Sequence, residues 1–194
     1  MRVNISLDSL DPEAYSALTG GGDVGRVVGG IEAALSAGLA PVKVNVVLAS
    51  ASSLERADLD GLVALARGRA IHVRFIEAMP SCGRQGYLPA ERVLDRLAQM
   101  GELRPAAGPE GGGPARYYRL DDSVGTLGVI APISEPFCGR CNRLRLTAAG
   151  RLLPCLARQE DGLDLAGLLR RGASPEALRD AVLSVLDRKA AGHE

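Results

Sequence analysis

The chain has 194 residues, which suits one domain or little more, and 46% of them are hydrophobic, which is enough for a packed core. Its formal net charge of +0 excludes binding to nucleic acid through bulk positive charge. Apolar runs long enough for a membrane span or a signal peptide are absent, so we expect a cytoplasmic protein. Because cytoplasmic thiols stay reduced, the four cysteines indicate metal-binding or catalytic groups before disulfides.

The first 80 residues alternate short apolar runs with amphipathic patterns. Buried strands are predicted at residues 3–7, 42–48 and 71–76. Helices are predicted from Asp11-Pro12, over residues 27–38, and from a capping box of Ser52 and Glu55. The order strand, helix, strand, helix, strand predicts parallel βα units, in which functional groups lie at the carboxyl ends of the strands.

The pattern changes beyond Pro80, and we place a domain boundary near residues 80–90. The elements predicted after it are a helix over 90–100, a loop rich in Gly and Pro over 105–114, two hairpins (116–120 with 126–130, and 143–146 with 151–153), and helices from about 163 and 174. Three parallel strands are too few for a closed barrel and leave an unpaired sheet edge. We therefore expect another polypeptide, or a longer enzyme, to supply further strands.

The strongest local signal is a group of three cysteines. Cys138 and Cys141 are separated by two residues, and Cys155 follows after thirteen more on the far arm of a predicted hairpin. Thiolates at this spacing suit zinc or an iron–sulfur cluster, and spacing alone favours zinc slightly. Zinc would need a fourth ligand, such as Cys82 or His193, whereas a four-iron cluster would keep one iron open. Cys82 has no other predicted role.

Several basic residues occupy positions where a binding role competes with a structural one. Lys43 and Lys189 are the only lysines in the chain. Lys43 lies in an apolar run and shares a strand face with Asn45, so it either reaches water or meets an anion. Arg143 and Arg145 would share a strand face beside the cysteines, where they either grip a phosphate or carboxylate or face solvent.

Other polar residues on the predicted strands give weaker signals. Arg74 and Glu77 raise the same question on the third strand as Lys43 does on the second. Ser6 and Asp8 share a face at the end of the first strand, where a turn cap is the simplest interpretation. His72 is assigned no role.

Four segments resemble those of the GTP 3',8-cyclase family, which are radical S-adenosylmethionine enzymes that open molybdenum cofactor biosynthesis. The segments are residues 2–11 (RVNISLDSLD), 42–47 (VKVNVV), 74–80 (RFIEAMP) and 137–145 (FCGRCNRLR). They occur in the family's order, and the resemblance covers nearly the whole chain.

The resemblance implies an α/β fold in which residues 1–85 form a partial (β/α) barrel of the TIM type without its N-terminal strands. Residues 86–194 would form an α+β region that binds an iron–sulfur cluster and GTP. The implied reaction, catalysed by a radical lyase, converts GTP to (8S)-3',8-cyclo-7,8-dihydroguanosine 5'-triphosphate. The implied ligands of a [4Fe-4S] cluster are Cys138, Cys141 and Cys155; those of GTP are Lys43, Arg143, Leu144 and Arg145; and those of S-adenosylmethionine are Ser6 and Met79.

The sequence also departs from the family. It contains no Cys-x3-Cys-x2-Cys, the motif of the cluster that cleaves S-adenosylmethionine, and it ends in Gly192-His193-Glu194 where the family often ends in Gly-Gly. We therefore expect this chain alone to bind the substrate without making the radical, and to work with a complementary N-terminal chain or a dimer partner. The alternatives are a non-catalytic module that binds a nucleotide or cluster, and a structural zinc domain.

Overall fold

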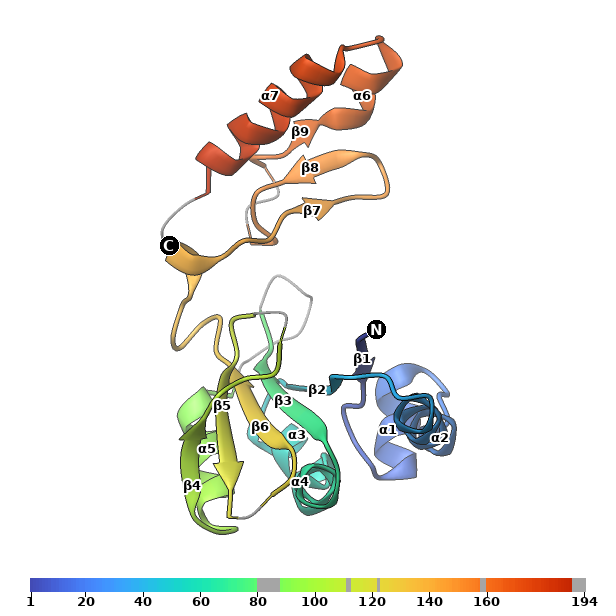
Figure 1. Ribbon diagram of the computed structural model, residues 1–194, viewed down its shortest axis with the longest axis vertical. Coiled ribbons are helices and arrows are strands. Elements are labelled where there is room, and N and C mark those ends of the chain that lie inside the picture. The colour runs from blue at the N-terminus through green and yellow to red at the C-terminus, as the bar shows by residue number, and fades with distance from the viewer. Residues whose placement is uncertain (80–87, 111–112, 122, 158–159, 190–194) are drawn as a thin grey trace. The chain divides into compact units, whose positions relative to one another are not determined.

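The computed structural model describes residues 1–79, 88–110, 113–121, 123–157 and 160–189. The chain forms two compact units, Met1–Glu135 and Pro136–Glu194, which Figure 1 traces from blue to red. This division falls well after the boundary near residues 80–90 that the sequence suggests. The difference arises because strands from the later segment join the sheet of the earlier one.

The first unit is a mixed α/β fold around a six-stranded sheet with the strand order β1-β2-β3-β6-β5-β4. Its parallel half contains β1 (Val3–Ser6), β2 (Val42–Leu48), β3 (Ile71–Glu77) and β6 (Thr126–Ile130). The first three are the strands predicted from the sequence, and they are parallel as expected. The sequence predicts β6 only as one arm of a hairpin, so its parallel pairing with β3 is new information.

Two antiparallel strands complete this sheet. β5 (Arg116–Leu120) forms the predicted hairpin with β6, and β4 (Leu103–Ala106) pairs with β5 at the edge. The prediction of a loop from residue 105 is therefore wrong at its start, because Pro105 belongs to β4. An edge strand tolerates proline because one side of its backbone needs no partner in the sheet.

The helices described in the first unit are α1 (Pro12–Thr19), α2 (Val24–Ser36), α3 (Ala51–Arg56), α4 (Leu59–Gly68) and α5 (Ala90–Ala98). α1 begins as predicted, with Asp11 accepting a hydrogen bond of 2.7 Å from the amide three residues on. The helix predicted from Ser52 is instead two helices. A capping box of Ser50 and Ser53 opens α3, and Asp58, at a φ of 52°, caps α4. None of the described helices combines the length and apolar character that a membrane crossing requires.

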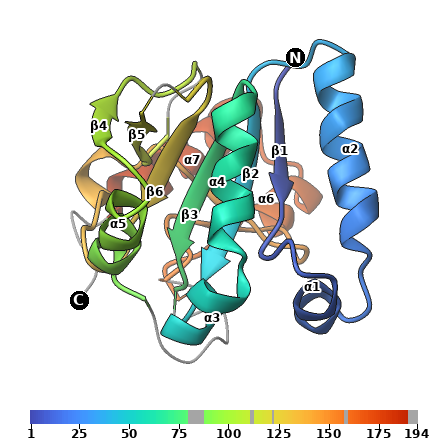
Figure 2. The same ribbon diagram turned by 90° about the horizontal axis from the view of Figure 1, so that it is seen from below.

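The helices of the first unit cover one face of its sheet, as Figure 2 shows for α2, α4 and α5. Side chains on that face, such as Val44 and Phe75, are buried in one core with Ile31 of α2, Leu62 of α4 and Leu97 of α5. Each fully buried side chain of this size contributes about 1.5–3 kcal/mol. This core holds the strands in place and leaves the opposite face of the sheet available for polar residues.

The second unit contains a three-stranded antiparallel sheet of β7 (Arg145–Leu146), β8 (Arg151–Leu153) and β9 (Leu163–Asp164). α6 (Leu165–Arg170) and α7 (Pro175–Asp187) follow as predicted, and α7 lies beside this sheet (Figure 1) with Val185 buried. The hairpin of β7 and β8 is confirmed. Its first arm begins at Arg145 instead of residue 143. The expectation that Arg143 and Arg145 share a strand face is therefore wrong, because Arg143 lies before the strand.

Candidate functional site

The face of the first sheet that lies opposite the helices carries mainly polar residues. Residues that pair between neighbouring strands point to the same face, as do alternate residues along one strand. The strand register therefore aligns two rows across β1, β2, β3, β6 and β5. The first row contains Asn4, Lys43, His72 and Thr126, and the second contains Ser6, Asn45, Arg74, Gly128 and Tyr117.

Lys43 is a buried cation on this polar face, with only 4% of its surface exposed. Its ammonium group donates a hydrogen bond to the backbone carbonyl of Glu110 at 3.3 Å. Burial lowers the pKa of Lys43, and the positive charges of Arg74 and Arg2 lower it further. Lys43 therefore does not extend into water, and the positive potential around it would favour an anion.

Arg74 joins three parallel strands on the same face. Its Nε donates to Oδ1 of Asn45, and its Nη2 donates to Oδ1 of Asn4, both at 2.8 Å. These two acceptors are neutral amides, so they orient the guanidinium group without neutralising its charge. The question that the sequence raises for Arg74 thus has a structural answer: it is a mostly buried, oriented cation close to Lys43.

His72 and Tyr117 extend this polar face toward the antiparallel strands. Nδ1 of His72 lies 2.8 Å from the hydroxyl of Thr126, and its ring meets that of Tyr117 edge to face at 6.4 Å between centroids. Burial lowers the pKa of His72, as do Lys43 and the arginines nearby, while burial raises the pKa of Tyr117. Both shifts favour the neutral form of the ring. No role is predicted for His72 from the sequence, although its alternation with Arg74 along one strand is a signal for a shared polar face.

The two residues implied to contact S-adenosylmethionine lie at the carboxyl ends of parallel strands. Ser6 is the last residue of β1, and Met79 is partly buried two residues beyond the end of β3. Asp8, two residues after Ser6, accepts a hydrogen bond from the Val47 amide at 2.9 Å. That contact supports the interpretation of Asp8 as a turn residue that fixes the end of β1.

Glu77 has a structural role at the end of β3. Its carboxylate is only 4% exposed and accepts hydrogen bonds from the amides of Ala90 at 2.8 Å and of Ile133 and Ser134 at 3.0 Å, and from the Ser134 hydroxyl. One carboxylate thus joins the start of α5 to the segment that follows β6. These backbone and serine donors satisfy the carboxylate, which explains why a charged residue occurs at this buried position in the sequence.

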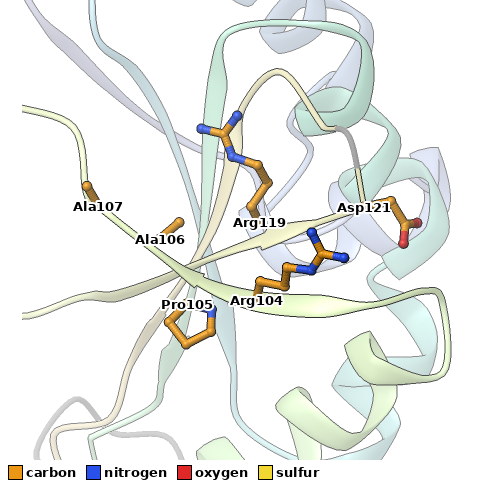
Figure 3. A pocket seen from close by; sticks show the side chains of 6 residues that line it. All are labelled: Arg104, Pro105, Ala106, Ala107, Arg119 and Asp121. Atoms are coloured by element: carbon orange, nitrogen blue, oxygen red, sulfur yellow. The ribbon is translucent and has the colours of Figure 1, made fainter.

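An open cavity of about 510 Å³ lies at the antiparallel end of the first sheet. Arg104 of β4 and Arg119 of β5 pair across the strands and project to the same side beside it (Figure 3). Arg104 donates to the carboxylate of Glu102 at 2.5 Å, and Arg119 donates to the Ser123 carbonyl at 3.3 Å. The sequence assigns no role to these arginines. Arg104 is paired with a carboxylate, whereas the acceptors of Arg74 are neutral amides.

The three cysteines all lie in the second unit. Cys138 opens a short 3-10 helix, η2 (Cys138–Arg140), and the amide of Cys141 closes the turn on the Cys138 carbonyl at 3.1 Å. Cys155 comes two residues after β8, behind the buried Pro154, and its sulfur accepts a hydrogen bond from the Ala157 amide at 3.4 Å. All three are thiols. The hairpin therefore brings the later cysteine back toward the earlier pair, as the spacing predicts.

The pKa values of Cys138 and Cys141 depend on burial and on neighbouring charged groups. Burial raises the pKa of Cys138, and the neighbouring Cys155 and Cys141 raise it further. Burial also acts to raise the pKa of Cys141, but the Arg143 amide and the Lys189 ammonium group outweigh it, so that this pKa is lowered. A lowered pKa favours the thiolate, which is the form that binds metals.

Thiols are ligands that suit zinc or an iron–sulfur cluster, so the chemistry of these three neighbouring cysteines fits either group. As the side chains stand, the described part of the chain has no group of three His, Cys, Asp or Glu residues that could hold a metal ion. Cys82 and His193, the two possible fourth ligands of zinc, lie outside the described residues.

The residues implied to bind GTP are divided between the two units. Lys43 belongs to the first unit, whereas Arg143, Leu144 and Arg145 belong to the second. The side chains of both arginines are exposed, and Leu144 is partly buried. The backbone of Arg143 takes part in the cysteine region, because its carbonyl accepts a hydrogen bond from Lys189 at 2.7 Å.

Residues 71–194 match the family described as Molybdenum Cofactor Synthesis C. Proteins named GTP 3',8-cyclase match almost the entire chain. Those from Pelotomaculum thermopropionicum and Heliobacterium modesticaldum are 44% and 46% identical to it, and that from Moorella thermoacetica is 40% identical. Each alignment covers 99% of this chain and 60% of the relative, so the chain spans about 60% of the length of the curated relatives it matches.

Proposed function

The chain belongs to the Molybdenum Cofactor Synthesis C family, and from that premise we propose that it is the substrate-binding part of a GTP 3',8-cyclase. In this function it would hold GTP for conversion to (8S)-3',8-cyclo-7,8-dihydroguanosine 5'-triphosphate. The observation that carries the proposal is the identity of 40–46% to three relatives of that name over 99% of the chain. The three cysteines beside Arg143 and Arg145 support it.

The three thiolates of Cys138, Cys141 and Cys155 would hold a [4Fe-4S] cluster. When bound, that cluster would supply an open iron that takes the purine of GTP as a ligand. Support comes from the donor chemistry and from the hydrogen bonds to two of the sulfurs, because such bonds stabilise thiolates around a cluster. We place this function in the cytosol, where thiols stay reduced.

The cations of the chain would bind the triphosphate. Lys43 is held in a region of positive charge, and Arg143 and Arg145 are exposed beside the cysteines. Arginine forks and a lysine ammonium group bind phosphate oxygens through charge-assisted hydrogen bonds. Leu144, between the two arginines, would contact the substrate as its family position implies.

Ser6 and Met79 would contact S-adenosylmethionine at the carboxyl ends of β1 and β3. Four parallel strands with helices on one face suit a sector of a (β/α) barrel, whose functional groups gather at that edge. β1 forms one edge of the sheet, where a complementary N-terminal polypeptide or a second copy would pair. Because this sequence contains no Cys-x3-Cys-x2-Cys, we expect the chain alone to bind GTP without cleaving S-adenosylmethionine.

Nucleotide binding is tested by titrating GTP into the anaerobic, iron-reconstituted chain in a calorimeter. Replacing Lys43 by Met, or Arg143 by Ala, should weaken binding by about 1.5–3 kcal/mol if each makes a charge-assisted hydrogen bond. Arg92→Met, which changes an exposed arginine on α5, is the matched control and should leave the affinity unchanged. Equal affinities for all the variants would remove Lys43 and Arg143 from the site.

The bound metal and the reaction are tested separately. Reconstitution with iron and sulfide should give about four irons per chain and the broad visible absorbance of a cluster. Stoichiometric zinc that iron does not replace would favour the structural zinc domain instead. Adding S-adenosylmethionine, reductant and GTP to the reconstituted chain should give no 5'-deoxyadenosine, and its appearance would show that the chain is active alone.

A further inference from the structure

Lys189 places its ammonium group among the cysteines of the second unit. It follows α7, and its Nζ donates to Sγ of Cys141 at 3.4 Å, to the Arg143 carbonyl at 2.7 Å and to the Pro154 carbonyl at 3.1 Å. An ammonium group has three donors, and here each donor has an acceptor. The hydrogen-bonding capacity of this lysine is therefore fully used within the cysteine region.

These three contacts connect the two segments that carry the cysteines. Cys141 and Arg143 belong to the segment between η2 and β7, whereas Pro154 immediately precedes Cys155 after β8. Lys189 lies 48 residues from Cys141 and 35 residues from Pro154 in the chain. A single side chain just after α7 thus joins the segment of Cys141 and Arg143 to the segment that precedes Cys155.

The fold of α7 positions this lysine. The helix is capped by Ser174, whose hydroxyl accepts a hydrogen bond from the Ala177 amide at 3.2 Å. After the last turn, the backbone amide of Lys189 donates to the Leu186 carbonyl at 3.0 Å. Val185, one turn earlier, is completely buried. The helix is therefore held by a cap at its start and by a buried side chain near its end, and a backbone hydrogen bond fixes the position of Lys189 after it.

From these contacts we infer that Lys189 is a positioning residue for the metal group held by the three cysteines. It would tie the two cysteine-bearing segments to each other, and its positive charge would offset part of the negative charge of the thiolates. Lysine suits this task better than arginine, because its acceptors lie in three directions around one nitrogen, while a guanidinium group donates within a plane. Lys189 has this role only if the thiolates hold the cluster proposed above.

The experiment compares four full-length chains reconstituted anaerobically: wild type, Lys189→Met, Lys189→Gln and Arg188→Met. The last replaces the exposed neighbouring cation and is the matched control. The measurements are iron and sulfide per chain, the rate at which a chelator removes the iron, and the reduction potential of the cluster. Circular dichroism of the chains before reconstitution establishes whether each variant is folded.

We expect Lys189→Met to lose iron to the chelator about tenfold faster or more, because outer partners of metal ligands commonly change metal affinity by 10- to 100-fold. Its remaining cluster should have a more negative reduction potential, since a positive charge beside the thiolates has been removed. Arg188→Met should match the wild type. If Lys189→Met does not fold, Lys189→Gln replaces it, because glutamine keeps a hydrogen-bond donor without the charge. The rate of iron loss and the reduction potential of that variant then decide the question.

The outcomes separate this inference from the proposed function. If the wild type holds a cluster and the folded Lys189 variant holds it equally well at the same potential, Lys189 has no positioning role, while the cluster itself stands. If the wild type takes up no iron and sulfide, the cluster proposal fails, and the role of Lys189 fails with it.

Discussion

Replacing Glu77 by Gln tests how the first unit closes around the end of β3. The substitution keeps the size of the side chain but removes its charge and converts one oxygen to an NH2 group. One carboxylate oxygen accepts from the Ala90 amide and the Ser134 hydroxyl, and the other accepts from the amides of Ile133 and Ser134. In either orientation of the glutamine, at least one buried backbone N–H then faces another donor.

The expected cost follows from these contacts. A hydrogen bond to a charged group contributes about 1.5–3 kcal/mol, and a buried donor without a partner costs about 1–3 kcal/mol. In its better orientation the glutamine keeps the bonds of one oxygen and loses the Ala90 bond, while the serine hydroxyl turns to accept. Glu77→Gln should therefore destabilise the first unit by about 2–4 kcal/mol, a large fraction of a typical domain's stability.

Urea unfolding followed by circular dichroism measures this loss, and hydrogen exchange at the start of α5 locates it. Glu91→Gln is the matched control, because Glu91 is an exposed carboxylate in the first turn of the same helix, where its charge contributes less than about 1 kcal/mol. If Glu77→Gln lowers stability no more than Glu91→Gln and the amide protection of α5 is unchanged, the carboxylate does not connect these segments as described.

Three further predictions concern the sheet and its helices. Gly125→Ala should strongly destabilise the first unit, because the added Cβ would lie 1.9 Å from the Ile71 carbonyl oxygen; thermal unfolding measures this, and a melting temperature equal to that of wild type would contradict it. Gly30→Ala should stabilise by about 0.5–1 kcal/mol, because Gly30 lies inside α2 with open space around it, and a loss of stability in the same assay would show that the space is occupied. The lowered pKa of His72 means that the unfolded chain binds a proton more readily, so stability should fall as the pH drops below the ordinary histidine value of 6.5. His72→Gln should reduce this pH dependence in urea titrations between about pH 7.5 and 5.5, and an unchanged dependence would assign it to other groups.

Features of the sequence that depend on near neighbours were predicted well. The strands β1, β2 and β3 follow from β-branched apolar runs, the start of α1 follows from Asp11 and Pro12, and the β7–β8 hairpin follows from its turn. The wrong predictions occur where contacts with distant residues outweigh the local sequence pattern. Pro105 joins an edge strand instead of a loop, and Asp58 divides one predicted helix into two.

The candidate sites were predicted unevenly for the same reason. The cysteine spacing singled out three cysteines that the structure places in one unit, and the position of Lys43 in an apolar run raised the question that its burial answers, because both signals are contained in short segments. The alignment of Lys43 with His72 and Arg74 depends on the register of separate strands. The contact of Lys189 with Cys141 joins residues 48 positions apart, and the sequence marked Lys189 only by the rarity of lysine.

By itself the sequence determined the βα order of the first 80 residues, the spacing of the three cysteines and the resemblance to one enzyme family, because patterning, spacing and motifs are local properties of the chain. Only the tertiary structure decided that β6 lies parallel to β3, that polar residues form one face of the sheet, and that a lysine after the last helix reaches the cysteines. Those features depend on contacts between distant residues, which packing of the apolar core and pairing of the strands establish.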